Sequence, residues 1–306
     1  MTALSQTDWF GPGPAKTGLF HVEQPARSKG RGEAPCPALV NSAKITAMAV
    51  IIAIVNQKGG VGKTTTAVNL GASLALADKD ILLIDTDPQG NSTSGLGINR
   101  NELKTSLYDA YAGRCAPDEA VAPSSVEHLD VLPSTVDLLG VEVELVGKEG
   151  RERMLSAIIA DLKKEYKYVL IDCPPSLGLL SLNALVAADS VIVPVQCEYY
   201  ALEGLSLLTR TLHLVRNSFN PTLEIKGILL TMYDTRNSLS RQVADEVRRH
   251  FREKVFDTVI PRNVTLAEAP SHGKPIILYD VRSSGAQGYL SLAKEILNEN
   301  GTGQGA

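Results

Sequence analysis

The sequence has few of the features that mark membrane, secreted or metal-thiolate proteins. No apolar segment reaches the roughly 20 residues of a membrane span, and the stretch at residues 186–195 is interrupted by Asp189 and Pro194. The first residues lack a basic segment followed by an apolar core, which argues against a secretory signal. The cysteines form no Cys-x-x-Cys pair; they are Cys36, Cys115, Cys173 and Cys197. We therefore expect a cytoplasmic protein with reduced thiols.

The sequence also has no excess of positive charge: it contains 30 Lys and Arg and 34 Asp and Glu, which gives a net charge of −4. Residues 1–47 carry five Lys or Arg and three Asp or Glu, so the rest of the chain is still more acidic. A uniformly basic surface is excluded, and any contact with nucleic acid must use a local patch. The hydrophobic content of 44% is enough for a substantial core.

A glycine-rich loop, Lys58-Gly59-Gly60-Val61-Gly62-Lys63-Thr64-Thr65, is the most informative stretch of the chain. It follows a short apolar strand, residues 50–55, and precedes a segment with alanine and leucine at helical spacing. In such a strand–loop–helix unit, backbone N–H groups point at phosphate, and the glycines let the backbone come close. Lys63 would reach the β- and γ-phosphates, and the Thr64 hydroxyl would sit on Mg²⁺.

The loop therefore predicts a site for ATP or ADP with Mg²⁺. The strict phosphate-loop pattern has glycine where this chain has Gln57, so the match is to a variant form. The residues assigned to the nucleotide here are Gly59, Gly60, Val61, Gly62, Lys63, Thr64 and Thr65.

Lys58 and four further segments make the sequence resemble one family. Lys58 stands where the deviant Walker A loop, Lys-Gly-Gly-x-Gly-Lys-Thr-Thr, has its signature lysine. The other segments are Asp85-Thr86-Asp87-Pro88-Gln89-Gly90-Asn91, Asp172-Cys173-Pro174-Pro175-Ser176, Gln196-Cys197-Glu198-Tyr199-Tyr200-Ala201-Leu202-Glu203-Gly204 and Val259-Ile260-Pro261-Arg262-Asn263. From about residue 50 to residue 297 the chain resembles the ParA/Soj chromosome- and plasmid-partitioning ATPases.

This resemblance implies a Mg²⁺-dependent ATP hydrolase of DNA segregation. ATP-bound subunits would form a sandwich homodimer, in which Lys58 crosses the interface to the nucleotide of the other subunit. The dimer would bind double-stranded DNA without sequence preference. Hydrolysis, slow until a ParB/Spo0J-type centromere-binding protein stimulates it, would release the DNA. We expect a cytoplasmic, nucleoid-associated protein without a membrane partner.

Apolar runs alternate with helical patterns along the chain, which predicts a doubly wound α/β fold with a mostly parallel sheet and helices on both faces. By resemblance it is the P-loop NTPase fold of the deviant Walker A type. The predicted strands are residues 50–55, 81–85, 129–132, 168–172, 190–195, 225–231 and 255–260. The predicted helices are residues 64–77, 149–165, 204–217, 239–251 and 286–298.

Three carboxylates end predicted strands. Asp172 follows a strand expected beside the phosphate loop, where a Walker B aspartate holds Mg²⁺ directly or through water. Asp85 and Asp87 are one residue apart, so on an extended backbone they point to opposite faces. By resemblance, Asp87 orients the attacking water and Asp85 joins the Mg²⁺ shell; the alternative for either is a carboxylate that caps the following turn. The expected catalytic residues are Lys58, Lys63 and Asp87, and the expected metal ligands are Thr64, Asp85 and Asp172.

Recognition of the purine is assigned to two loops after late strands. One contains Met232, and the other is Pro261-Arg262-Asn263, which lies near the purine in the family that this chain resembles. An ordinary strand-end turn is the alternative for Arg262.

One predicted helix, residues 239–251, is a candidate DNA contact. Val243, Val247 and Phe251 would form its buried stripe. Arg241 and Arg248 would share another face with Arg252 just beyond it, and the patch could extend to Arg216, Arg236 and Arg249. A solvated helix face is the alternative. Without a helix-turn-helix or zinc signature, contacts should go to phosphates and be indifferent to sequence.

Other classes of the same superfamily fit less well. A membrane-associated cell-division-site ATPase would need a basic amphipathic C-terminal helix, whereas the chain ends Asn298-Glu299-Asn300-Gly301-Thr302-Gly303-Gln304-Gly305-Ala306. An iron–sulfur reductase of the nitrogenase type shares a cluster through cysteines, and Cys173 does not match that placement. A tyrosine-kinase variant would need a terminal tyrosine cluster, which this sequence lacks.

The chain divides into three parts. Residues 48–300 are expected to form a single P-loop ATPase domain, and residues 301–306 a flexible tail. Residues 1–47 carry Gly, Pro, Ser, Lys and Arg without periodicity and are expected to be disordered or not part of the native protein.

Translation from Met48 should give a fully active ATPase, because Met48 directly precedes the first strand and members of the resembled family commonly start there. The codons CTG-TTC-CAC-GTG-GAA-CAG encode residues 19–24 and contain TGTTCCACGTGGAACA, a palindrome that resembles the centromere-like site of the partner protein. A chance hexapeptide is the alternative. Sequencing the gene and comparing the ATPase rates of both chains checks this; other codons at these positions contradict the palindrome.

Overall fold

The computed structural model describes residues 49–162 and 164–302. Within these residues, eight strands form one sheet in the order β3-β4-β2-β5-β1-β6-β7-β8. All neighbouring strands are parallel except β3 and β4, which are antiparallel. The strands are β1 (Val50–Ile54), β2 (Ile81–Asp85), β3 (Ala122–Pro123), β4 (Leu129–Leu132), β5 (Tyr168–Asp172), β6 (Ser190–Gln196), β7 (Glu224–Tyr233) and β8 (Val255–Pro261).

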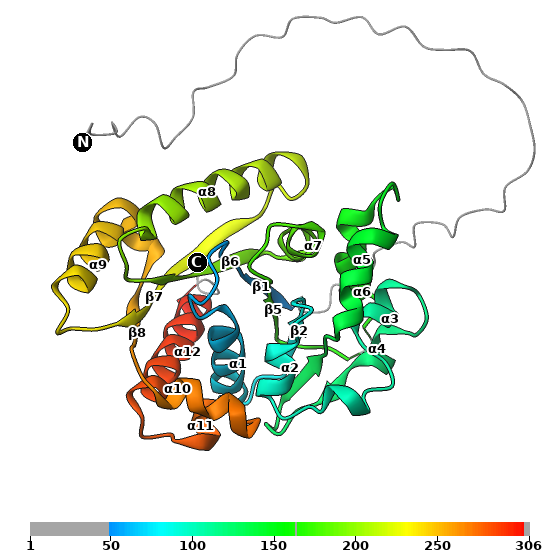
Figure 1. The fold of residues 1–306 in the computed structure, drawn as a ribbon, viewed down its shortest axis with the longest axis horizontal. Coiled ribbons are helices and arrows are strands. Elements are labelled where there is room, and N and C mark those ends of the chain that lie inside the picture. The colour runs from blue at the N-terminus through cyan, green and yellow to red at the C-terminus, as the bar shows by residue number, and fades with distance from the viewer. Residues whose placement is uncertain (1–48, 163, 303–306) are drawn as a thin grey trace, which may run out of the picture. The chain divides into compact units, whose positions relative to one another are not determined.

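Helices cover both faces of this sheet, as Figure 1 shows. One apolar core lies between the sheet and α3, α5, α6, α7, α8 and α9, and the other between the sheet and α1, α10, α11 and α12. The helices are α1 (Lys63–Ala75), α2 (Asn91–Gly95), α3 (Leu107–Tyr111), α4 (Pro117–Ala120), α5 (Leu139–Glu144), α6 (Met154–Ala160), α7 (Leu179–Ala187), α8 (Ala201–Ser218), α9 (Ser238–Phe251), α10 (Thr265–Glu268), α11 (Ile276–Tyr279) and α12 (Ser284–Thr302).

The predicted fold class is confirmed. Strands β2, β4 and β5 match the predicted ranges residue for residue, and every residue of β2 and β5 is buried. Such continuous apolar runs are what a parallel sheet covered on both faces requires. The short antiparallel edge strand β3 was not predicted, because two residues with a proline give no periodic signal.

The register of the central strands brings three strand ends to one edge. Asp85 of β2 lies opposite Asp172 of β5, and Ile54 of β1 lies opposite the same Asp172. The loop after β1 and both carboxylates therefore meet at the carboxyl edge of the sheet, where open α/β sheets bind their ligands.

The prediction of a helix over residues 149–165 is wrong in length. The α-helix covers only Met154–Ala160, after a 3₁₀ turn at Arg151–Arg153. Gly150, with a φ of 73°, precludes an earlier helical start. Beyond the helix, Lys164 pairs with Asp130 at 2.7 Å, so a contact with β4 replaces further helical turns.

Helices α2, α3, α4, α5, α7, α10 and α11 were not predicted, and most are too short to show a helical period. Helix α12 continues to Thr302, so the first two residues of the predicted flexible tail are helical. Residues 1–48 and 303–306 lie outside the described residues, and the predictions for 1–47 stay predictions. In the described part of the chain, no helix is both long and apolar enough to cross a membrane.

Candidate functional site

The glycine-rich loop joins β1 to α1 and has the backbone geometry that its sequence predicts. Gly60 and Gly62 have φ values of 73° and 90°, a region in which side chains other than glycine are strained. Gly62 is the N-cap of α1, and no described side chain caps the helix there. The first N–H groups of α1 are thus left for a ligand, which suits a phosphate.

Lys63, the first residue of α1, curls back over the loop. Its side chain is buried, and its Nζ donates to the carbonyl oxygen of Lys58 at 3.0 Å. Burial lowers the pKa of Lys63, an effect that the negative charges of Asp172 and Asp87 oppose. The lysine therefore connects the loop to the carboxylates at the same edge.

Lys58 points outward and is held by its own chain. Its Nζ forms an ion pair with Glu198 at 2.9 Å, and its N–H donates to the side chain of Asn56 at 3.0 Å. Because both charged side chains are 43–50% exposed, the pair is worth less than about 1 kcal/mol. A lysine held this weakly can be released when another anion approaches.

Asp85 and Asp172 are fully buried side by side. Burial raises the pKa of Asp85, and burial together with the neighbouring charge of Asp85 raises the pKa of Asp172. Strand β2 ends at Asp85, so the alternating geometry considered from the sequence does not extend to Asp87. Instead, the N–H of Asp87 donates to Asp85 at 3.2 Å, and Asp87 accepts a hydrogen bond from the N–H of Gln89 at 2.9 Å.

Helix α2 donates hydrogen bonds to both carboxylates, but the number of bonds differs between them. Asp85 Oδ2 accepts hydrogen bonds from the N–H and the hydroxyl of Thr93, at 2.9 and 2.7 Å. Asp172 Oδ2 accepts one from the Ser92 hydroxyl at 2.6 Å. Asp172 Oδ1 is buried and has no hydrogen-bond partner among the described residues.

This arrangement fits a divalent cation. The unpaired oxygen of Asp172 is an acceptor that a metal or its water would satisfy, and the Thr64 hydroxyl lies close enough to lower the pKa of Asp172. Asp85 acts as the cap of the turn before α2, the alternative noted from the sequence, and its direct place in a Mg²⁺ shell stays a prediction. The described residues contain no cluster of three His, Cys, Asp or Glu for a metal, so phosphate and water would complete the shell.

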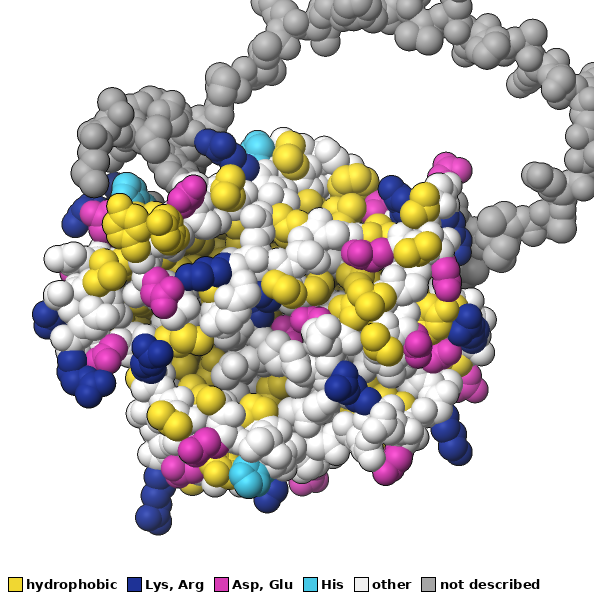
Figure 2. Space-filling model, viewed as in Figure 1, with side chains coloured by type: hydrophobic (Ala, Val, Ile, Leu, Met, Phe, Trp, Pro, Cys, Tyr) yellow, Lys and Arg dark blue, Asp and Glu magenta, His cyan; other side chains and the backbone are white. Residues whose placement is uncertain are grey.

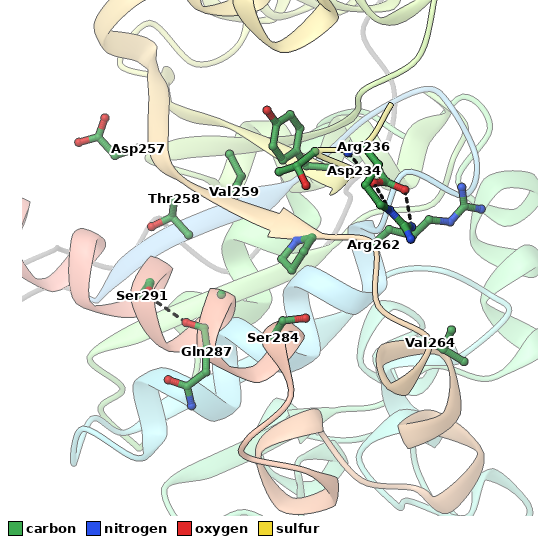
Figure 3. A pocket seen from close by; sticks show the side chains of 14 residues that line it. Asp234, Arg236, Asp257, Thr258, Val259, Arg262, Val264, Ser284, Gln287 and Ser291 are labelled. Atoms are coloured by element: carbon green, nitrogen blue, oxygen red, sulfur yellow. Dashed lines mark hydrogen bonds and ion pairs between the residues drawn. The ribbon is translucent and has the colours of Figure 1, made fainter. Parts of the chain in front are cut away.

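A cavity of about 920 Å³ opens beside the ends of β7 and β8, against α12 (Figure 3). Pro261 and Arg262 line it, whereas Met232 and Asn263, also predicted for the purine, do not. The side chain of Asn263 instead accepts from the N–H of Leu266 and donates to Ser284. Met232 adopts a φ of 50°, and the neighbouring Thr231 donates to the loop carbonyl of Val61 at 2.8 Å.

The candidate DNA-contacting arginines are spread out. Helix α9 buries Val243 and Val247 as predicted, and Arg248 and Arg249 lie in its last turn. The α-helix ends at Phe251, and Arg252 follows with a φ of 44°, so the predicted helical face does not include Arg252.

The other arginines proposed for DNA contact are spread along α9, which is about 20 Å long, or lie outside this helix. Arg236 and Arg241 flank the start of α9, and Arg236 pairs with Asp234 at 2.9 Å. Arg249 pairs with Glu246 at 3.0 Å, and Arg216, in the last turn of α8, donates to the Pro221 carbonyl. In Figure 2 the Lys and Arg side chains are likewise scattered over the face shown.

Comparison with known proteins identifies the family. An AAA domain family model matches residues 49–225. The chain is 57% identical over 249 residues to the sporulation initiation inhibitor protein Soj of Bacillus subtilis (strain 168), covering 81% of this chain and 98% of that protein. It is 54% identical over 250 residues to the chromosome partitioning protein ParA of Myxococcus xanthus (strain DK1622), covering 82% of this chain and 88% of that protein. The chain belongs to the ParA/Soj family of chromosome-partitioning ATPases.

Solved structures agree with this ParA/Soj assignment. A cobyrinic acid a,c-diamide synthase from Mycobacterium smegmatis, crystallised with ADP and magnesium, has a TM-score of 0.74 and 37% identity, covering 84% of this chain and 97% of that one. The cell division ATPase MinD of Pyrococcus furiosus has a TM-score of 0.67 and 29% identity, covering 82% and 99%. These neighbours share the predicted fold, and a nucleotide with Mg²⁺ fits the ParA/Soj site.

Three side chains of this ParA/Soj site were not assigned roles from the sequence. Ser92 and Thr93 hydrogen-bond to the carboxylates, and Glu198 holds Lys58. Glu198 lies within a segment that carried the family resemblance, so a signal for it existed. Serine and threonine are common at the start of a helix. The sequence pattern therefore gave no indication that Ser92 would hydrogen-bond to a carboxylate on another strand.

Replacing Asp172 by Asn should stabilise the metal-free protein at pH 8. Because the folded-state pKa of Asp172 is raised, its contribution to stability is fully present below the ordinary value of 3.8 and is lost as the pH rises. The amide keeps the bond from Ser92 and removes the buried charge. We expect the Tm in EDTA at pH 8 to rise by about 2–4 °C, which corresponds to ~1 kcal/mol in a domain of this size.

Thermal melts at pH 5 and pH 8 check this, with the gain expected to be smaller at pH 5. The control is Asp137→Asn, which makes the same substitution at an exposed position away from the site. A lower Tm than wild type at pH 8 would contradict the inferred cost of the buried charge.

Proposed function

We propose that this chain is a Mg²⁺-dependent ATPase whose ATP-bound dimer holds DNA and whose hydrolysis releases it. The observation that carries this is the unpaired, buried oxygen of Asp172 at the same sheet edge as a phosphate loop with an uncapped helix start. The names of the relatives, Soj and ParA chromosome partitioning proteins, supply the setting of DNA segregation.

The proposal assigns a role to the phosphate loop and to two of the strand-end carboxylates. The N–H groups of the loop and α1 hold the phosphates, Lys63 neutralises their charge, and Thr64 and Asp172 hold Mg²⁺. Bound Mg²⁺ supplies charge neutralisation on the phosphate oxygens. Asp87, at the edge of the site and 9% exposed, orients the attacking water. Phosphoryl transfer needs little covalent help, so the basal rate is slow and depends on how well these groups are positioned.

Dimerisation uses the surface around Lys58. Lys58 is already at the surface, and its only described ion-pair partner is the exposed Glu198. The next residues, Tyr199 and Tyr200, are 69% and 66% exposed and stack edge to face. Exposed aromatic side chains beside a releasable charge are typical of a surface that a partner covers. A second copy would bury the tyrosines and give Lys58 the nucleotide phosphate in place of Glu198.

The DNA contacts are assigned to arginines of α9 and its flanks, made to phosphates and therefore indifferent to sequence. Because the chain is acidic overall and these arginines are spread out, one subunit offers few contacts to DNA phosphates. Two subunits side by side would double their number. Stimulation of hydrolysis is assigned to a ParB/Spo0J-type centromere-binding protein. Localisation on the nucleoid follows from DNA binding in the ATP state.

Asp87→Ala and Lys58→Ala should separate hydrolysis from dimerisation. Asp87→Ala keeps the phosphate contacts and Lys58, so it should bind ATP, dimerise and stay on DNA without turnover. Lys58→Ala should bind ATP as a monomer and fail to bind DNA. The measurements are ATP turnover, size by light scattering, and DNA binding by anisotropy with ATP, with ADP and without nucleotide.

Glu198→Gln serves as the matched control for Lys58→Ala, since it removes the same ion pair and keeps the lysine. It should dimerise at least as readily as wild type. An intact ATP dimer of Lys58→Ala would exclude the cross-subunit role, and wild-type turnover of Asp87→Ala would exclude the water-positioning role. Equal DNA binding with ATP, with ADP and without nucleotide would exclude the switch.

Arg248→Ala and Arg252→Gly should each weaken DNA binding equally on unrelated sequences. Each lost phosphate contact should flatten the slope of log K against log [salt] by about 0.9 per subunit. Glycine suits position 252, because it accepts the φ of 44° without strain and leaves the fold at least as stable. The control is Lys148→Ala, an exposed lysine after α5, at the other end of the molecule from α9 (Figure 1). An unchanged slope at wild-type affinity would return these arginines to an ordinary solvated face.

A further inference from the structure

Ser92 makes a polar contact that the proposed function does not itself require. It is the second residue of α2, is fully buried, and donates its hydroxyl to Asp172 Oδ2 at 2.6 Å across 80 residues of sequence. This length is typical of a charge-assisted O–H···O⁻ bond. The bond ties a short helix after β2 to the carboxylate at the end of the neighbouring strand β5.

The effect of this bond is to fix the plane of the Asp172 carboxylate. The side-chain torsion of an aspartate carboxylate is broad, so the direction in which its oxygens point depends on the contacts they make. With Ser92 on Oδ2, the oxygen left without a partner is Oδ1. The carboxylate of Asp172 is thereby held in one plane, and its second oxygen points in a fixed direction.

The neighbouring residue makes the opposite choice for the other carboxylate. Thr93 gives both its N–H and its hydroxyl to Asp85 Oδ2, while the N–H of Asp87 takes Oδ1, so both oxygens of Asp85 are occupied. The Thr93 hydroxyl is fixed in turn by the N–H of Ser134 at 3.0 Å. Because of these two adjacent residues of α2, both oxygens of Asp85 accept hydrogen bonds, whereas only one oxygen of Asp172 does.

We propose that Ser92 is a positioning residue for the metal, which orients Asp172 so that its free oxygen faces the Mg²⁺ of the bound nucleotide. The inference rests on the proposed Mg²⁺-nucleotide function, and it adds a residue outside the phosphate loop and the strand-end carboxylates. Groups that orient a metal ligand commonly affect metal affinity by 10- to 100-fold when they are removed. Ser92 should therefore tune Mg²⁺ affinity without touching metal or nucleotide.

The test is a Mg²⁺ titration of the full chain with a fluorescent ADP, for wild type and Ser92→Ala. Nucleotide affinity in EDTA measures the phosphate loop alone, and the Mg²⁺ concentration at half effect measures the metal site. We expect Ser92→Ala to raise that concentration about 10- to 100-fold and to leave the affinity in EDTA unchanged. Ser94→Ala is the matched control, because Ser94 lies on the same helix but donates to the carbonyl of Gly90 and to no carboxylate.

The outcomes are distinct. A wild-type Mg²⁺ midpoint in Ser92→Ala overturns the positioning role. A parallel loss of affinity with and without Mg²⁺ also overturns it, since it would mean that Ser92 only supports the fold of the loop; the Tm in EDTA reports the same damage independently. If wild type itself shows no Mg²⁺-dependent nucleotide binding, while Asp172→Asn behaves like wild type, the proposed function fails and this inference fails with it.

Discussion

The burial of two like charges at the end of the central strands is the constraint on which the site depends. The parallel register places Asp85 and Asp172 opposite each other, and both are inaccessible to solvent. Such a pair is stable only if hydrogen bonds and a nearby cation compensate it. Lys63 supplies a positive charge from the first turn of α1, and α2 supplies hydroxyl and N–H donors. The remaining demand, at Asp172 Oδ1, is the one that Mg²⁺ would meet.

Because α2 provides those donors, the parts of the chain that position α2 also act on the site. Gly97, just after α2, and Gly273 both adopt positive φ, and a Cβ on Gly97 would lie 2.9 Å from the Gly273 carbonyl oxygen. The segment after Gly273 is anchored to α1, since Asn69 accepts from the N–H of Ile276 at 2.7 Å and donates to the Thr65 carbonyl. The phosphate-loop helix, the C-terminal segment and α2 therefore form one connected support, and the glycine contact sets the distance within it.

The sequence was sufficient for the fold and for the phosphate loop, because both are encoded locally. A buried parallel strand is a continuous apolar run, and the left-handed backbone at Gly60 and Gly62 needs glycine. Contacts between distant residues were not readable in this way. The role of Ser92 depends on the register between β2 and β5, which brings it to Asp172, eighty positions away in the sequence.

Exceptions to local rules account for the other misses. The step from Asp85 to Asp87 was considered on an extended backbone, but the strand ends at Asp85 and a turn begins. Arg252 was expected to continue the face of α9, but it takes a positive φ that no residue pattern announces. The side chain of Asn263 hydrogen-bonds to Ser284 and to the N–H of Leu266 at the start of α10, and its place near the purine stays a prediction. In each case a tertiary contact or a chain reversal decided the outcome.

The strengths of these interactions divide the site into a fixed part and a releasable part. Hydrogen bonds to the buried carboxylates are short, charge-assisted and shielded from water, so breaking one leaves an uncompensated charge in the interior. The pair between Lys58 and Glu198 is half exposed, and water replaces either partner at little cost. The proposed switch would need both properties, since the groups that hold metal and phosphate would stay fixed while the contact with a second subunit would change with the nucleotide. At this sheet edge the first kind of contact is buried and the second lies at the surface, where the second subunit of the proposed dimer would reach it.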